Sequence, residues 1–267
     1  MCGISGVFNY IEKTIDTKSI LEKIVKLQHS RGPDDQGIWI SKCKKISFGH
    51  NRLSIIDLTK NGRQPFVSND ENLVITFNGE IYNFKEIKKE LSAKNIFFRS
   101  NTDTEVILES YKYWGIDFIK KLRGMFAFAM WDSKKRKLIL ARDPFGIKPL
   151  YFSKKNGTFY FASEVKSLLS INDIDKNYSA AGLVSYYLWG NIQEPYTLYE
   201  NIKSIKKGTC LIIKEDGSEE TYNFANIKSA ILNSNALNFK NAEDLAIYLK
   251  EIVNETVNFH QVSDTPI

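Results

Sequence analysis

Short apolar stretches, many of them alternating with polar positions, occur along most of the chain and predict β-strands. We expect strands over residues 3–8, 37–41, 46–50, 73–77, 137–142, 149–152, 158–162, 210–213 and 220–222. Residues 125–131 (MFAFAMW) are apolar on both faces, which is typical of a strand buried between two layers. Asn156-Gly157 predicts a type I′ hairpin turn, and Asp216-Gly217 predicts the turn of a last hairpin.

Longer segments carry apolar residues three or four positions apart, and these predict helices. We expect the first helix to begin after an N-cap at Thr17. Two more should begin at Asn83 and Thr102, because each is followed three residues later by a glutamate, as in a capping box. A further helix is predicted over 180–188. Strands followed by helices and then by more strands favour an α+β fold in which helices cover stacked sheets.

The C-terminal part of the chain has a different character from the rest. Residues 223–241 are polar and predict a linker, whereas 245–257 carry an apolar stripe at helical spacing. One helix cannot bury its own apolar face, so this helix either packs on the main domain or belongs to a domain that is mostly missing. We therefore expect a principal domain over 2–222, a linker over 223–241, and the first helix of a second domain within 242–267.

Composition narrows the class of protein further. With 267 residues and a hydrophobic fraction of 43%, the chain has enough apolar residues for a folded core. It contains neither an apolar run near 20 residues nor a secretory leader, so we expect a cytoplasmic protein without a membrane partner. The net charge of +6 comes from scattered lysines that lack interleaved aromatic residues, which argues against nucleic-acid binding. The spacing of Cys2, Cys43 and Cys210 favours neither disulfides nor zinc.

The residues Met1-Cys2-Gly3 supply the first candidate chemistry. Removal of Met1 would leave a cysteine whose thiol and α-amine belong to the same residue. An α-amine with an ordinary pKa of about 7.7–8.0 is partly unprotonated at neutral pH and can accept the proton of the thiol. Cys2 could then attack a carbonyl carbon without help from a histidine, although many proteins begin with Met-Cys for no catalytic reason.

Three further sites fit the needs of such a nucleophile. Asn78-Gly79, expected at the end of the strand over 73–77, can supply a side-chain amide and a backbone N–H to an oxyanion. Arg52 can bind a carboxylate through two hydrogen bonds, and Asp103 in the first turn of a helix can bind an ammonium group. Taken alone, each is more typical of a turn, surface or capping residue. Together they describe a pocket for an amino acid whose side chain ends in an amide.

Several ordered motifs resemble those of a known family. These are MCGI at 1–4, RGPD at 31–34, RLSIID at 52–57, FNGEIYN at 77–83, DTE at 103–105 and RDPFG at 142–146. They are similar to the motifs of class II glutamine amidotransferase domains, in the variant of glutamine-hydrolysing asparagine synthetases, over about residues 2–222. The resemblance implies a four-layer α/β/β/α N-terminal-nucleophile hydrolase fold made of two stacked, largely antiparallel sheets.

The resemblance also implies roles for individual residues and for the whole enzyme. Cys2 matches the nucleophile, Asn78 and Gly79 match the oxyanion hole, and Arg31 matches an arginine that supports the nucleophile. The residues that match the glutamine-binding positions are Arg52, Leu53, Ile55, Ile56, Asn78, Gly79, Glu80 and Asp103. The implied partners are L-glutamine and a C-terminal synthetase domain that this chain lacks. The resemblance implies no cofactor for this part, because ATP and Mg²⁺ belong to the absent domain, and it leaves a homodimer open.

Two departures from the family pattern qualify this hypothesis. Ser30 separates His29 from Arg31, so His29 is assigned no role, and the two remaining histidines, His50 and His260, are expected to be structural. Residues 264–267 look like the approach to the family's ATP-binding loop, which the chain does not contain. Three functions stay open: the ammonia-producing half of a synthetase acting on aspartate or another carboxylate, a non-catalytic module that binds a partner synthetase, and an amidase for a different amide.

Overall fold

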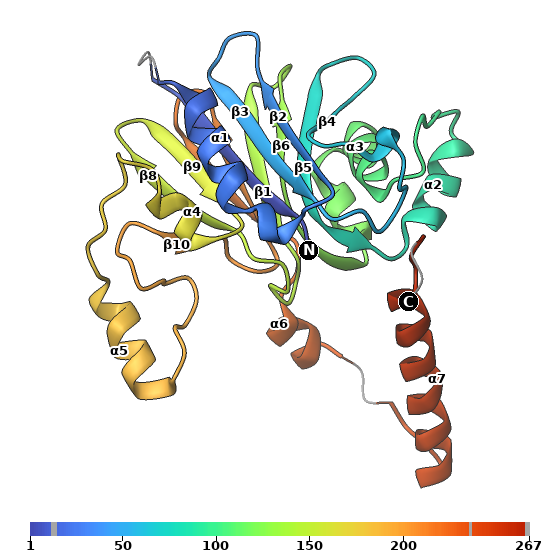
Figure 1. Cartoon of the computed structure of the whole chain (residues 1–267). Coiled ribbons are helices and arrows are strands. Elements are labelled where there is room, and N and C mark those ends of the chain that lie inside the picture. The colour runs from blue at the N-terminus through green and yellow to red at the C-terminus, as the bar shows by residue number, and fades with distance from the viewer. Residues whose placement is uncertain (12–14, 235–236, 265–267) are drawn as a thin grey trace.

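Twelve strands form two six-stranded antiparallel sheets in the computed structural model, which describes residues 1–11, 15–234 and 237–264. The strand order of the first sheet is β10-β8-β9-β1-β3-β2, and that of the second sheet is β12-β11-β7-β6-β5-β4 (Figure 1). The first sheet contains β1 (Gly3–Asn9), β2 (Asp35–Ile40), β3 (Ile46–Arg52), β8 (Tyr151–Lys155), β9 (Thr158–Ala162) and β10 (Lys203–Ser204). The second contains β4 (Phe66–Val67), β5 (Leu73–Ile81), β6 (Gly124–Asp132), β7 (Lys137–Arg142), β11 (Thr209–Lys214) and β12 (Glu219–Asn223).

Helices cover the outer face of each sheet. The first sheet is covered by α1 (Thr17–Leu27) and α4 (Val165–Leu169), and the second by α2 (Phe84–Ser92) and α3 (Asp103–Trp114). Three short 3₁₀ segments are η1 (His29–Arg31), η2 (Lys60–Gly62) and η3 (Gly115–Lys121). The result is the α/β/β/α arrangement that the family resemblance implies.

Three hydrophobic clusters hold the four layers together. One lies between the first sheet and α1, one lies between the two sheets, and one lies between the second sheet and α2–α3. Strand β6 shows how the sequence builds them, because Phe126 and Phe128 point to the helices whereas Ala127 and Ala129 point to the other sheet. The prediction of a strand apolar on both faces is therefore confirmed: this strand is central in its sheet and has a packed layer on each side.

The helix N-termini agree only in part with the expected caps. Asp16, not Thr17, caps α1 by accepting a hydrogen bond from the Ser19 N–H, and Thr17 is the first helical residue. Thr102 caps α3 as expected, accepting from the Glu105 N–H over 3.2 Å. Asn83 stands at the N-cap of α2 but makes no capping bond. Its side chain instead bonds the backbone at 121 and 123, so tertiary contacts take the place of the local one.

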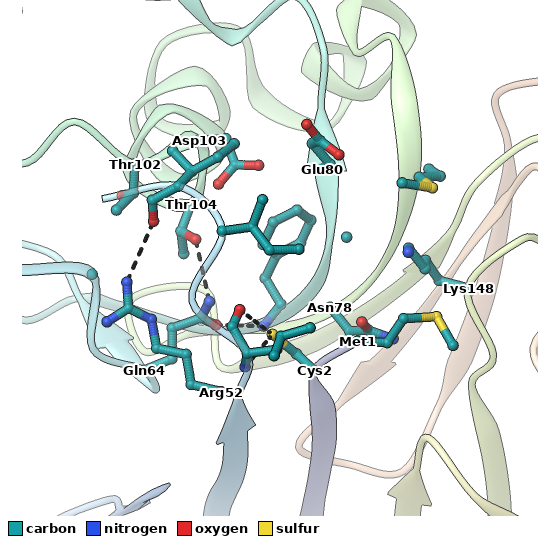
Figure 2. Close-up of a pocket in the computed structure, with 17 residues that line it drawn as sticks. Met1, Cys2, Arg52, Gln64, Asn78, Glu80, Thr102, Asp103, Thr104 and Lys148 are labelled. Atoms are coloured by element: carbon teal, nitrogen blue, oxygen red, sulfur yellow. Dashed lines mark hydrogen bonds between the residues drawn. The ribbon is translucent and has the colours of Figure 1, made fainter. Parts of the chain in front are cut away.

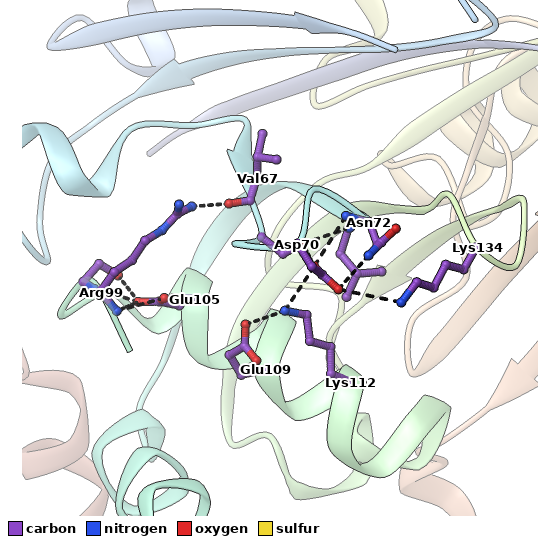
Figure 3. A network of polar contacts seen from close by, with 11 residues as sticks. Val67, Asp70, Asn72, Arg99, Glu105, Glu109, Lys112 and Lys134 are labelled. Carbon is purple, nitrogen blue, oxygen red and sulfur yellow. Dashed lines mark hydrogen bonds and ion pairs between the residues drawn. The ribbon is translucent and has the colours of Figure 1, made fainter. Parts of the chain in front are cut away.

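The segment before α3 is held by a network of charged side chains (Figure 3). The Glu105 carboxylate accepts from the N–H groups of Arg99 and Ser100, while the Arg99 guanidinium donates to the Val67 carbonyl. Two turns after Glu105, near the end of α3, Lys112 forms ion pairs with Glu109 (2.9 Å) and Asp70 (3.4 Å). The Glu105 and Arg99 contacts tie the start of α3, and with it Asp103, to the edge strand β4, and the Lys112 ion pair with Asp70 ties its end to the turn after that strand.

Three helices extend away from the sheets in Figure 1: α5 (Ala180–Trp189), α6 (Ile227–Leu232) and α7 (Ala242–His260). Within residues 223–241, the predicted linker, β12 ends at Asn223 and α6 forms, with the Asn226 side chain accepting from Ser229 N–H as its cap. Helix α7 begins close to where we expected it, but none of its residues is buried. Within the described residues, no helix is long and apolar enough to cross a membrane.

Candidate active site

Nearly all the predicted site residues line one pocket (Figure 2). The pocket lies at the start of β1 and the end of β3, both in the first sheet, and β5 of the second sheet forms another side of it. Its lining includes nine of the ten residues expected at the site. The tenth, Arg31, is not part of the lining but donates a hydrogen bond to the carbonyl oxygen of Cys2. The full lining is Met1, Cys2, Arg52, Leu53, Ile55, Ile56, Gly62, Gln64, Phe77, Asn78, Gly79, Glu80, Thr102, Asp103, Thr104, Met125 and Lys148. Residues from six separate segments of the chain thus surround one space.

Cys2 immediately precedes β1 and is held by two neighbours. Its Sγ atom lies 3.4 Å from the backbone nitrogen of Leu53 and 3.6 Å from the carbonyl oxygen of Leu53. Arg31 Nε donates to the Cys2 carbonyl oxygen over 3.0 Å. Burial raises the pKa of the thiol, and the hydrogen bond to Leu53 opposes this shift. The thiol is therefore mainly protonated at neutral pH and needs a base to become a nucleophile.

No histidine lies among the pocket residues. His50 is buried, with its Nδ1 atom 3.1 Å from Thr76 Oγ1, and burial lowers its pKa to about 3. His29 is exposed and bonds Gln36, and the ring of exposed His260 lies 4.5 Å from that of Tyr82. Among the described residues that line this pocket there is therefore no cysteine–histidine pair.

Asn78 and Gly79 lie inside β5, not at its end. The prediction was wrong about the strand boundary because the β5–β6 pairing continues to Ile81 and Gly124, past the end of the apolar run. Asn78 is 1% exposed, and its Nδ2 atom has no hydrogen-bond partner among the described residues. A Cβ atom at Gly79 would lie 2.4 Å from the Met125 carbonyl oxygen, so glycine allows β5 and β6 to approach here. The unpaired Asn78 amide is a donor available to a ligand.

Arg52, at the end of β3, is held by the loop that follows it. Its guanidinium donates to the carbonyl oxygens of Thr59 (3.0 Å), Ile56 (3.4 Å) and Asp57. A guanidinium has five N–H donors, so these bonds leave others for the pocket. A Cβ atom at Gly62 would lie 2.1 Å from Arg52 Nη2, which explains the glycine at this position. The site thus presents a fixed cation suited to a carboxylate.

Two carboxyl groups stand on the opposite wall. Asp103, in the first turn of α3, is 5% exposed, and its Oδ2 accepts from the Ile81 N–H over 3.1 Å. Burial raises its pKa to about 7, and the nearby Glu80 charge adds to the shift. Burial also raises the pKa of Glu80, which the charge of Lys148 opposes. Glu80 Oε1 has no partner within the described chain and is therefore an acceptor available to a cation.

Lys148, which was not predicted as a site residue from the sequence, lines the pocket on the other side of Cys2 from Arg52 (Figure 2). This side chain is 6% exposed, and burial lowers its pKa. The motif RDPFG carried the signal, since it forms the turn that presents Lys148. Buried Asp143 accepts from the Lys148 N–H over 3.0 Å, and Arg142 Nε donates to the Lys148 carbonyl oxygen over 2.8 Å.

Comparison with known proteins agrees with this geometry. The pattern of the family described as glutamine amidotransferase domain matches residues 1–224. The chain belongs to this family. Glutamine hydrolysis is the half-reaction that the family membership and the pocket support together.

Two relatives show where such domains occur. Asparagine synthetase [glutamine-hydrolyzing] 1 of Bacillus subtilis (strain 168) is 40% identical over 273 residues, which cover all of this chain but 41% of that protein. A putative asparagine synthetase [glutamine-hydrolyzing] 2 of Methanocaldococcus jannaschii is 36% identical over 237 residues, covering 82% of this chain and 45% of that protein. The amidotransferase domain therefore spans less than half the length of these relatives.

A solved structure supports the fold. Glutamine phosphoribosylpyrophosphate amidotransferase from B. subtilis, complexed with ADP and GMP, superposes with a TM-score of 0.62 at 20% identity. The match covers 84% of this chain and 49% of that one. At this identity the likeness concerns the fold alone, and it agrees with the N-terminal-nucleophile sandwich.

Among the described residues no group of three or more His, Cys, Asp or Glu side chains could hold a metal ion.

Proposed function

We propose that this amidotransferase domain hydrolyses L-glutamine to glutamate and ammonia through a thioester on Cys2, after removal of Met1. The observation that carries the proposal is the arrangement of one pocket, in which a thiol lies between an unpaired amide donor, Asn78, and separate binding groups of opposite charge. Arg52 would bind the α-carboxylate of glutamine, and Asp103 with Glu80 would bind its α-ammonium group. The side-chain amide then reaches Cys2.

The reaction needs one base that acts twice. The α-amine of Cys2 accepts the thiol proton, and sulfur attacks the amide carbon to give a tetrahedral oxyanion. The Asn78 Nδ2–H and the Gly79 N–H stabilise this oxyanion. When the C–N bond breaks, the protonated amine gives its proton to the departing nitrogen, which leaves as ammonia. The amine then takes a proton from water, the hydroxide attacks the thioester, and glutamate leaves as Cys2 regains its proton.

Burial of the nucleophile end of the chain supports this assignment of the base. The N-terminal amine has a lowered pKa, first because burial disfavours its charged form and further because of the charges of Arg31 and Lys148. The amine created at Cys2 would begin in the same surroundings. Because the pKa of the thiol is raised, the thiol needs a base to lose its proton, and an amine that is neutral at neutral pH can serve as that base.

We further propose that the ammonia serves an ATP-dependent asparagine synthetase, with aspartate as the acceptor. Support comes from the printed names of the two relatives, both glutamine-hydrolysing asparagine synthetases. In this proposal residues 2–222 are the glutaminase, 223–241 connect it to a synthetase part, and 242–267 begin that part. ATP and Mg²⁺ would bind there and not in the pocket of Cys2, and the complete enzyme would act in the cytoplasm.

A second candidate is a non-catalytic module that binds a partner synthetase. One observation favours it: α5 and α7 expose large apolar side chains. Among these side chains are Tyr187 (82% exposed) and Trp189 (71% exposed). This candidate requires that Met1 be retained in the mature protein.

The two candidates are separated by one experiment on the purified chain. Intact mass first establishes whether Met1 is removed, and glutamate release from L-glutamine without ATP is then measured. We expect turnover that is abolished by Cys2→Ala and retained by Cys43→Ala, since Cys43 is exposed and outside the pocket. Asn78→Ala should lower kcat by about 10²–10³-fold through loss of one oxyanion donor. Turnover that survives Cys2→Ala would refute the proposed mechanism.

A further inference from the structure

Residues 53–59 form a loop between β3 and η2, which we call the pocket loop. This loop determines the direction of the Arg52 guanidinium, the proposed carboxylate-binding group. Leu53, Ile55 and Ile56 of this loop line the pocket, and Leu53 contacts Cys2 Sγ. The loop also supplies all three carbonyl oxygens that accept hydrogen bonds from the Arg52 guanidinium. A change in the loop would therefore alter both the nucleophile's surroundings and the direction of Arg52.

Regular secondary structure does not hold this loop in place. Its residues belong to neither sheet, and Asp57 has a φ of 54°, in the left-handed region that few residues other than glycine adopt. The Asp57 carboxylate stabilises this conformation from within the loop by accepting from Thr59, and it also accepts from the Asn101 N–H over 3.2 Å. The backbone of residues 55–57 needs other partners.

Those partners come from Asp264, which is 207 residues away in sequence from Asp57. The Asp264 N–H donates to the Ile55 carbonyl oxygen over 2.9 Å, and Asp264 Oδ2 accepts from the Asp57 N–H over 2.7 Å. These two bonds enclose Ile56, whose own carbonyl oxygen accepts from Arg52. Val262, in the same segment, packs against the hydrophobic cluster that Ile56 also contacts.

We infer that Asp264 is a positioning residue for the carboxylate end of the glutamine pocket, because it holds Ile55–Asp57 in the conformation that directs Arg52. The inference rests on the proposed function and connects the glutamine pocket to the segment that carries Asp264. The segment that carries Asp264 follows α7, whose residues are not buried against the sheets. In the proposed two-part enzyme this segment leads toward the ATP-dependent part. A movement there would change the affinity for glutamine through two hydrogen bonds.

The first arm of the test compares Asp264→Ala with Asp264→Asn in the full chain. Alanine removes the acceptor of the Asp57 N–H, whereas asparagine keeps an oxygen in the same place. We expect Asp264→Ala to raise KM for L-glutamine by about three- to tenfold, the effect of one hydrogen bond, with kcat changed less than about twofold. Asp264→Asn should restore KM to near the wild-type value. Gln261→Ala, an exposed change in the same segment, is the matched control.

The second arm does not depend on turnover. Amide hydrogen exchange of residues 53–59 should become faster in Asp264→Ala and stay as in wild type in Asp264→Asn and Gln261→Ala. Faster exchange with an unchanged KM would overturn the positioning role, and so would unchanged exchange. If the unmodified protein neither hydrolyses nor binds glutamine, the proposed function fails. The exchange measurement then decides by itself whether Asp264 holds the loop.

Discussion

The side chain of Arg31 donates from Nε to the carbonyl oxygen of Cys2 over 3.0 Å, which fixes the backbone of the nucleophile and not its thiol. The Arg31 guanidinium comes from η1, on the short connection between α1 and β2. Its Nη2 atom has no partner within the described residues. Arg31 thus combines one structural bond with a positive charge close to the future α-amine.

We expect Arg31→Met to reduce kcat for glutamine by about 10–100-fold, because a charge-assisted hydrogen bond to the Cys2 backbone is lost. KM should change little, since Arg31 does not line the pocket. Steady-state kinetics with L-glutamine checks both numbers. Arg136→Met, a change at an exposed arginine, is the control, and an equal loss of kcat in that variant would contradict the assignment.

Gly62 provides a test of Arg52 that leaves the guanidinium itself unchanged. A Cβ atom in Gly62→Ala would meet Arg52 Nη2 at 2.1 Å, so the side chain must turn away from its carbonyl partners. We expect KM for glutamine to rise by about 10–100-fold while kcat changes much less, because the contact with the carboxylate is made equally in the ground and transition states. The double variant with Arg52→Lys should be no worse than the poorer single variant. Additive losses would show that Gly62 acts elsewhere.

Lys148 should influence the base of the reaction. Its positive charge lowers the pKa of the N-terminal amine, so its removal in Lys148→Met should raise the pKa of the amine at Cys2. The acidic limb of kcat/KM against pH would then move to higher pH. Lys148→Arg keeps the charge and should keep the profile, as should Lys206→Met at the exposed surface. A profile that does not move in Lys148→Met would exclude this role.

The raised pKa of Asp103 predicts that glutamine binding releases a proton. Burial raises this pKa to about 7, whereas an ammonium group beside Asp103 would favour the ionised form. Below pH 7 glutamine should therefore bind more weakly and release a proton on binding, and the affinity should rise as the pH passes through 7. Calorimetric titration of the Cys2→Ala protein in buffers of different ionisation enthalpy measures this release. Asp103→Asn should bind weakly with no proton release, and an unchanged release would assign the proton to Glu80.

The raised pKa of Asp103 also makes the free energy of unfolding depend on pH. Between its ordinary value near 3.8 and about 7, Asp103 holds a proton in the folded state and not in the unfolded state. Its contribution to the free energy of unfolding therefore falls as the pH rises from 4 to 7. Denaturant unfolding of the wild type and Asp103→Asn at the two pH values measures that difference, which the substitution should remove.

Much of the architecture could be predicted from local pattern. The apolar runs at 125–131, 137–142 and 158–162 predict strands buried between two layers, because both faces are apolar. Thr102 similarly marks the start of α3 through a bond to a residue three positions away. The boundaries of β5 and the cap of α1 could not be predicted, since strand pairing and alternative local acceptors decide them.

The sequence by itself determined the chemical groups of this protein: a thiol beside the N-terminus, an amide, a guanidinium and two carboxylates, in motifs that resemble one family. Only the tertiary structure decided how these groups act on one another. Whether Asn78 is unpaired, whether burial raises the pKa of Asp103, and which loop directs Arg52 all depend on distances between segments far apart in sequence. Hydrogen bonds and desolvation act over a few ångströms, so Lys148 and Asp264 acquire their places only when the layers pack.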